Sequence, residues 1–164
     1  MQTKQISTKA ELINYTDIAK CIADLDGDEL AVPRLFAELR RQRNDLEQVV
    51  RQVHVITDSE GMPDNLRTQF IRAGATIHKS NGLRTEALTT VKALRLAEQF
   101  DVVTLVVADA GYLPLIREMK YMGARVELHA MPSADPALFP AADEVVGLYP
   151  PGAPLPVANN RRAA

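Results

Sequence analysis

The run VVTLVV at residues 102–107 constrains the fold more than any other feature of this sequence. Its apolar side chains do not alternate with polar ones, which is typical of a central parallel strand that helices cover on both faces. Parallel strands need crossover connections, which are usually helices and nearly always right-handed. The run therefore predicts a Rossmann-like, three-layer α/β/α fold with a mainly parallel sheet.

The segments around this run repeat a β-α-β order. Further strands are predicted at residues 20–25, 53–57, 76–78, 125–130 and 144–148, with helices that begin near Pro33, Pro63, Glu86 and Pro114. The helix from Glu86 is expected to bury an apolar stripe made of Ala87, Leu88, Val91, Leu94 and Ala97. A capping box from Thr8 to Glu11 predicts a short helix before the first strand.

One domain is expected, because the chain has 164 residues, of which 46% are hydrophobic and 24% charged. Residues 1–19 are predicted to be an N-terminal extension with the short helix, residues 20–149 the domain, and residues 150–164 a disordered tail. The single cysteine, Cys21, and the lack of an apolar run of roughly 20 residues lead us to expect a cytoplasmic protein without a membrane partner. The net charge of −2 excludes a uniformly basic surface but leaves a local RNA-binding patch open.

Acidic residues follow three of the predicted strands. They are Asp26 with Asp28, then Asp58, then Asp109, and Glu86 lies at a helix start. Ligands of open parallel sheets bind beyond the carboxyl ends of the strands, so these acids are expected to meet there. Gathered carboxylates must be protonated, solvated or neutralised by a cation, and Mg²⁺ or Mn²⁺ suits their oxygen atoms. The alternative is that each acid is a solvated turn residue.

Four segments, in order, resemble the NYN domain, a PIN-like family that includes LabA-like proteins. Residues 25–30 (LDGDEL) resemble its apolar-Asp-Gly-x-Asn motif, and residues 105–116 (LVVADAGYLPLI) resemble its strand followed by SGDxDFxPL. Residues 123–126 (GARV) and 138–148 (LFPAADEVVGL) are similar to its closing segments. The likeness covers residues 20–148, and it implies a PIN-like fold and a metal-dependent ribonuclease, in the form of an endoribonuclease that uses Mg²⁺ or Mn²⁺.

The resemblance also implies the site. Asp26 and Asp109 match acids of the family, while Glu86 stands at the position of a helix Asp, so these three would hold the metal. Glu29 replaces an Asn, Lys92 replaces a second helix Asp, and Gly111 replaces the second acid of the strand motif. The acidic site is therefore degenerate, and weak, altered or lost activity all remain compatible with it. Helper roles in orienting water are assigned to Asp24, Asp28, Glu29 and Asp58.

Basic residues near the predicted site suggest an RNA contact, and Lys79, Arg84, Arg117 and Lys120 are the candidates for binding phosphate. Two other functions stay open. One is a catalytically inactive NYN-fold module for binding or assembly, such as a homo-oligomer. The other is a haloacid dehalogenase-like phosphatase, because residues 24–28 (DLDGD) resemble the Asp-x-Asp-Gly-Thr motif in which Asp24 would be the nucleophile and Asp26 the acid/base.

Overall fold

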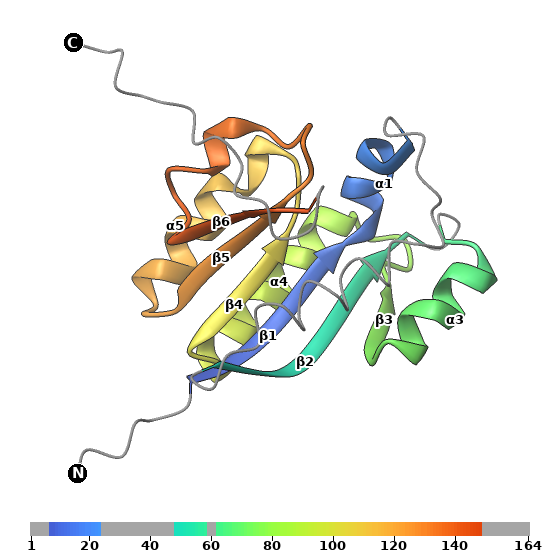
Figure 1. Ribbon diagram of the computed structural model, residues 1–164, viewed down its shortest axis with the longest axis horizontal. Helices are drawn as coiled ribbons and strands as arrows, with labels where there is room; N and C mark the ends of the chain where they lie inside the picture. Colours follow the sequence, from blue (N-terminus) through green and yellow to red (C-terminus); the bar gives the residue numbers. More distant parts are fainter. Residues whose placement is uncertain (1–6, 24–47, 59–61, 149–164) are drawn as a thin grey trace.

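The computed structural model describes residues 7–23, 48–58 and 62–148, and these form a three-layer α/β/α fold around one sheet (Figure 1). The six described strands are all parallel, in the order β3-β2-β1-β4-β5-β6. They are β1 (Ser7–Asn14), β2 (Gln48–Thr57), β3 (Ala75–Lys79), β4 (Val102–Val106), β5 (Arg125–Ala130) and β6 (Glu144–Gly147). The helices are α1 (Tyr15–Ala23), α3 (Asp64–Arg72), α4 (Thr85–Gln99) and α5 (Leu113–Tyr121), with the 3₁₀ turns η2 (Ala110–Tyr112) and η3 (Pro136–Leu138).

Two apolar cores lie on opposite faces of the sheet. On one face α4 and α5 pack on the strands through residues such as Leu96 and Ile116. On the other face α1 and α3 pack through Tyr15, Ile18 and Phe70, and the rings of Tyr15 and Phe70 meet edge to face. All five residues of β4 are buried, as expected for a strand covered on both sides. The three-layer fold predicted from the run at residues 102–107 is therefore confirmed.

The strand order indicates where a ligand would bind to this sheet. The chain runs outward from β1 to β2 and β3, and then α4 carries it back across the sheet to β4, which pairs with the other side of β1. In this doubly wound order the connections at the carboxyl ends of β1 and β4 diverge, and ligands bind in the opening between them. Residues just after Asn14 and Val106 are therefore the first place to look for a site.

The prediction for the start of the domain was wrong. The segment that carries the Thr8 to Glu11 capping box is strand β1, in the centre of the sheet, and the expected strand at residues 20–25 is the last turn of α1 as far as residue 23. In place of the contacts of a capping box, the backbone N–H and the hydroxyl of Thr8 both donate to the carboxylate of Asp101. Glu11 is 1% exposed. The domain therefore begins within residues 1–19, which had been predicted to be an extension.

The buried face of α4 also differs from the predicted stripe. Its buried residues are Thr85, Thr89, Ala93, Leu96 and Ala97. Val91 is 49% exposed, so the helix turns small and polar side chains toward the sheet and part of its apolar stripe outward. Small residues let a helix lie close to strands, which periodicity of apolar residues alone does not reveal. The predicted helix near Pro33 and the tail at residues 150–164 lie outside the described residues.

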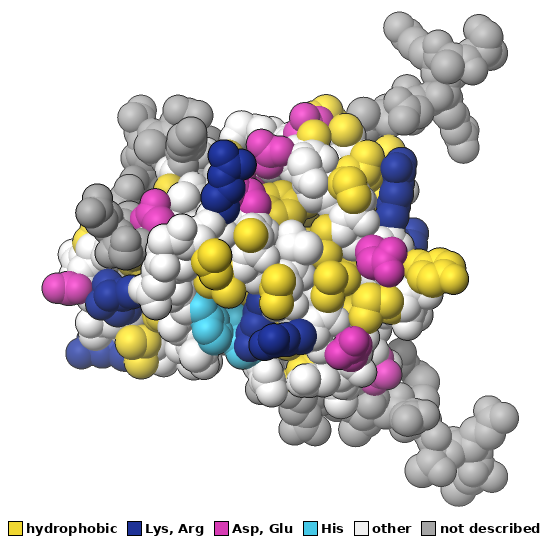
Figure 2. Space-filling model, turned by 180° about the vertical axis from the view of Figure 1, so that it is seen from behind, with side chains coloured by type: hydrophobic (Ala, Val, Ile, Leu, Met, Phe, Trp, Pro, Cys, Tyr) yellow, Lys and Arg dark blue, Asp and Glu magenta, His cyan; other side chains and the backbone are white. Residues whose placement is uncertain are grey.

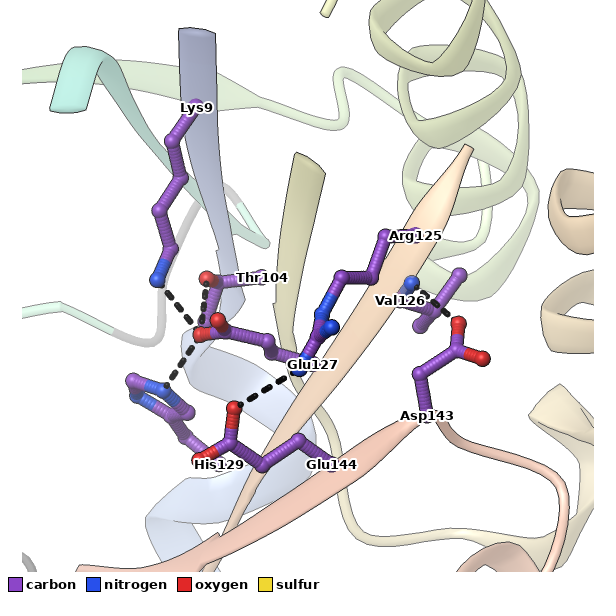
Figure 3. A network of polar contacts seen from close by, with 8 residues as sticks. All are labelled: Lys9, Thr104, Arg125, Val126, Glu127, His129, Asp143 and Glu144. Carbon is purple, nitrogen blue, oxygen red and sulfur yellow. Dashed lines mark hydrogen bonds and ion pairs between the residues drawn. The ribbon is translucent and has the colours of Figure 1, made fainter. Parts of the chain in front are cut away.

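A buried polar network crosses the face of the sheet that carries α1 (Figure 3). The Lys9 ammonium pairs with Oε2 of Glu127, which also accepts from the Thr104 hydroxyl at 3.4 Å and lies 3.5 Å from Nε2 of His129. Burial disfavours the charged form of Glu127, but the contacts with His129 and Lys9 outweigh it and lower its pKa to about 2. This network joins β1, β4 and β5, and it is a structural feature that the sequence reading did not find.

Candidate functional site at the carboxyl ends of β1 and β4

Asn14 is the last residue of β1 and directly precedes α1. Its side-chain oxygen accepts the backbone N–H of Asp17 at 3.1 Å, which caps the first turn of the helix. Its amide nitrogen donates to the phenol oxygen of Tyr112 at 2.6 Å. Asn14 is fully buried and Tyr112 is 3% exposed, so the bond joins the end of β1 to the turn that follows β4. Tyr112 therefore packs in the core.

Asp17 reaches across the opening to the end of β4. Its Oδ2 atom accepts the backbone N–H of Ala108 and, at 3.3 Å, that of Asp109. Burial raises the pKa of Asp17 above its usual value, and the nearby negative charges of Asp109 and Glu86 raise it further, against the effect of the two backbone bonds. Carboxylates from α1, α4 and the end of β4 therefore act on one another at the predicted crevice.

Asp109 and Gly111 form a tight turn beside Asp17. Oδ1 of Asp109 accepts the backbone N–H of Gly111 at 2.6 Å, which caps the 3₁₀ turn η2. A Cβ atom on residue 111 would lie 2.9 Å from that same Oδ1, closer than real contacts allow. In this conformation of Asp109, glycine is thus the residue that fits at position 111.

The remaining predicted site residues are placed as follows. Glu86 is exposed in the first turn of α4, and its charge acts on Asp17. Asp58 follows β2 and donates its backbone N–H to the hydroxyl of Thr16 at 3.0 Å. Lys79, Arg84, Arg117 and Lys120 are all exposed. Asp24, Asp26, Asp28 and Glu29 lie outside the described residues.

Lys92 belongs to a different environment from the acids. It lies near the imidazoles of His54 and His78. Nδ1 of His54 lies 2.9 Å from Nε2 of His78, and Nε2 of His54 forms a hydrogen bond with Oε1 of Gln52 at 2.8 Å. Burial and then the charge of Lys92 lower the pKa of His54 to about 4, so this histidine is neutral at physiological pH. Lys92 therefore acts electrostatically on the histidine pair.

The fit of a divalent metal can be judged from the oxygen donors. Asp17, Glu86 and Asp109 offer the hard oxygen ligands that Mg²⁺ and Mn²⁺ prefer. One oxygen of Asp17 and one of Asp109 are already engaged by backbone N–H groups. Within residues 7–23, 48–58 and 62–148 no three His, Cys, Asp or Glu side chains are arranged as a metal site. The donor chemistry suits these ions, but the described residues do not form a closed set of ligands.

Sequence reasoning missed Asn14 and Asp17, although a signal was present. An Asn followed three residues later by an acid is a helix-start pattern of the same spacing as the Thr8 to Glu11 box. Moving the first strand to residues 7–14 would have put Asn14 at its carboxyl end and Asp17 in the following helix. Among the described residues, the acid nearest the carboxyl end of β1 is thus Asp17, in the first turn of α1.

No protein family model matches this sequence, and no curated protein does. Among solved structures, the chain is similar to the crystal structure of a protein of unknown function from Vibrio parahaemolyticus. The two chains are 16% identical, with a TM-score of 0.68 over 90% of this chain and 96% of the other. This likeness supports the three-layer fold and carries no information on activity. No described helix has the length and apolar character to cross a bilayer.

Proposed function

We propose that this chain is a PIN-like domain of the NYN type that acts on RNA at the carboxyl ends of β1 and β4. The observation that carries the proposal is the convergence of Asp17, Glu86 and Asp109 at the point where the strand order reverses. Carboxylates that repel one another, with Asp17 among them half-buried, are unfavourable for the fold alone, and such groups are a frequent mark of a functional site. A bound Mg²⁺ or Mn²⁺ would activate water and stabilise charge on a phosphodiester.

The chain's own residues have distinct roles in this proposal. Asp17 is oriented by the N–H groups of Ala108 and Asp109, which leaves Oδ1 for a ligand. Asp109 is oriented by Gly111, and Glu86 is exposed at the rim of the opening. Asn14 and Tyr112 hold the two strand ends at a fixed separation, so they position the acids without touching substrate.

The competing proposal is a module that binds RNA or assembles without cleaving it. It is favoured by Gly111, which leaves the turn after β4 with one acid, and by the engagement of Oδ1 of Asp109 with a backbone N–H. The phosphatase alternative is weaker, because it needs a strand directly before residues 24–28, whereas the described residues before them are helical. A nucleophile at Asp24 would then not follow a strand end.

Cleavage of a labelled single-stranded RNA in the presence of Mn²⁺ tests the proposal. Asp17→Asn and Asp109→Asn are expected to abolish cleavage, because each removes a charge from the opening while keeping the size of the side chain. Asp64→Asn is the matched control, since the Asp64 side chain is 96% exposed on α3. Equal rates for all four proteins would remove the catalytic claim, and binding without cleavage in the wild type would favour the binding module.

A further inference from the structure

A pocket of about 690 Å³ opens between α5 and the segment that contains η3. Leu113, Arg117 and Lys120 of α5 line one side. Apolar residues line the other, namely Pro136, Ala137, Pro140 and Ala141. The volume is within the range of pockets that hold small organic ligands, and the combination of an apolar wall with two cations favours a ligand that has a flat apolar part and a negative charge.

The pocket adjoins the acidic site. The backbone N–H of Asp135, next to the pocket residue Pro136, donates to the carbonyl of Ala108 at 2.8 Å, and Ala108 directly precedes Asp109. On the other side, Leu113 follows Tyr112, which packs beneath the site. The pocket therefore lies beside the segment that follows β4 and carries Asp109. Figure 2 shows hydrophobic side chains on the side of the molecule that carries α5, with both basic and acidic side chains among them.

The two cations of the pocket are not equivalent. Lys120 donates to the carbonyl of Ala141 at 2.9 Å and lies 3.5 Å from the carboxylate of Asp143, so its charge is partly neutralised and it holds the two walls together. Arg117 is exposed and has no hydrogen bond or ion pair within the described part of the chain. A free guanidinium over an apolar wall is suited to bidentate binding of a phosphate.

We propose that this pocket binds one nucleotide of a single-stranded RNA, with its phosphate on Arg117 and its base against the wall of Pro136, Ala137 and Pro140. Single strands expose their bases to such surfaces, whereas the bases of a duplex are stacked inside it. The inference rests on the proposed function for the identity of the ligand, but it concerns binding and needs no cleavage. It assigns the pocket as the subsite that directs RNA past Asp109.

Anisotropy of a labelled single-stranded RNA of about twelve nucleotides, a length that spans several binding positions, measures this binding in EDTA, where no metal-dependent cleavage occurs. Arg117→Ala is expected to weaken binding about tenfold or more, since a charge-assisted hydrogen bond is lost. Arg72→Ala, an exposed arginine on α3, is the matched control and is expected to leave binding within about twofold. Ala137→Leu keeps the charge but fills the pocket, and it is also expected to weaken binding.

The outcomes separate this inference from the proposed function. Wild-type affinity in both Arg117→Ala and Ala137→Leu would overturn the pocket as the RNA subsite, even if Mn²⁺-dependent cleavage were observed. Binding that depends on both residues, together with an absence of cleavage, would support the pocket and overturn the nuclease. Equal competition by inorganic phosphate or by an acidic peptide would overturn the assignment to a nucleotide. No RNA binding by the wild type would overturn both.

Discussion

Asn14 donates to the phenol oxygen of Tyr112 at 2.6 Å, and this buried bond fixes the end of β1 against the turn that follows β4. Burial raises the pKa of the Tyr112 phenol above its usual value, so the group remains neutral and accepts the bond throughout the physiological range. The same asparagine caps the helix that carries Asp17. The position of Asp17 relative to the turn after β4 thus depends on the uncharged pair Asn14 and Tyr112.

Removing that phenol oxygen should cost stability. Tyr112→Phe leaves the buried amide of Asn14 without its partner, and we expect a loss of about 1–3 kcal/mol in the free energy of unfolding. Urea denaturation measures it. Tyr121→Phe is the matched control, because Tyr121 is the last residue of α5 and is 88% exposed. This substitution should change the free energy of unfolding by less than about 0.5 kcal/mol. Equal effects of the two substitutions would contradict the role of the pair.

Asp17 should make the fold less stable as its charge develops. In the folded protein the pKa of Asp17 is raised above 3.8, its value in an unfolded chain. The folded state therefore holds the proton more tightly than the unfolded state, and the free energy of unfolding falls as the pH rises from 3.8 to the pKa of the folded state. Asp17→Asn keeps an oxygen for the N–H groups of Ala108 and Asp109 but cannot ionise. We expect the stability of the variant relative to the wild type to rise as the pH is raised above 3.8, as followed by urea denaturation. A difference in stability between the two proteins that does not change with pH would contradict a raised pKa of Asp17.

The network around Glu127 predicts a strong dependence on Lys9. Lys9→Met would leave the Glu127 carboxylate in the interior without that ion pair, which costs about 3–5 kcal/mol for buried pairs. Arg125→Met breaks the exposed pair with Glu144 and should cost no more than about 1 kcal/mol. Thermal and urea unfolding of both variants compare them. Similar losses in the two proteins would show that burial does not control the strength of the network.

Gly111 should be required for the position of Asp109. Gly111→Ala places a methyl group 2.9 Å from the present position of Oδ1, so the carboxylate must rotate away. Because the residue is exposed, we expect a change of less than about 1 kcal/mol in stability but a clear loss of Mn²⁺-dependent RNA cleavage. Rate measurements and urea unfolding on the same preparation test this. An unchanged rate would mean that the orientation of Asp109 has no part in the reaction.

The sequence predicted the later strands of the fold better than the first one. The strand at residues 125–130 was placed correctly. Strand β1 was missed because Lys9 and Glu11 resemble surface residues, whereas tertiary partners keep both buried. An ion pair across three strands cannot be read from local pattern.

Asp109 lies after β4 and Glu86 in the first turn of α4, as the sequence indicated, whereas Asp26 lies outside the described residues and its part in a site stays a prediction. Glu86 and Asp109 could be found because parallel strands bring their carboxyl ends to one edge of the sheet. Asp17 could not be found once β1 had been misplaced, since its role depends on which strand precedes α1. The pocket beside α5 was also beyond the sequence, because Arg117 and Pro136 meet only through tertiary packing.

Calorimetric titration of Mn²⁺ into the metal-free protein tests most directly whether Asp17, Glu86 and Asp109 form one functional centre. The account predicts saturable binding by the wild type and by Asp64→Asn, and the loss of that binding in both Asp17→Asn and Asp109→Asn. Undiminished binding in Asp17→Asn and Asp109→Asn, or no binding by the wild type at millimolar Mn²⁺, would contradict the claim that these carboxylates are a metal-dependent site.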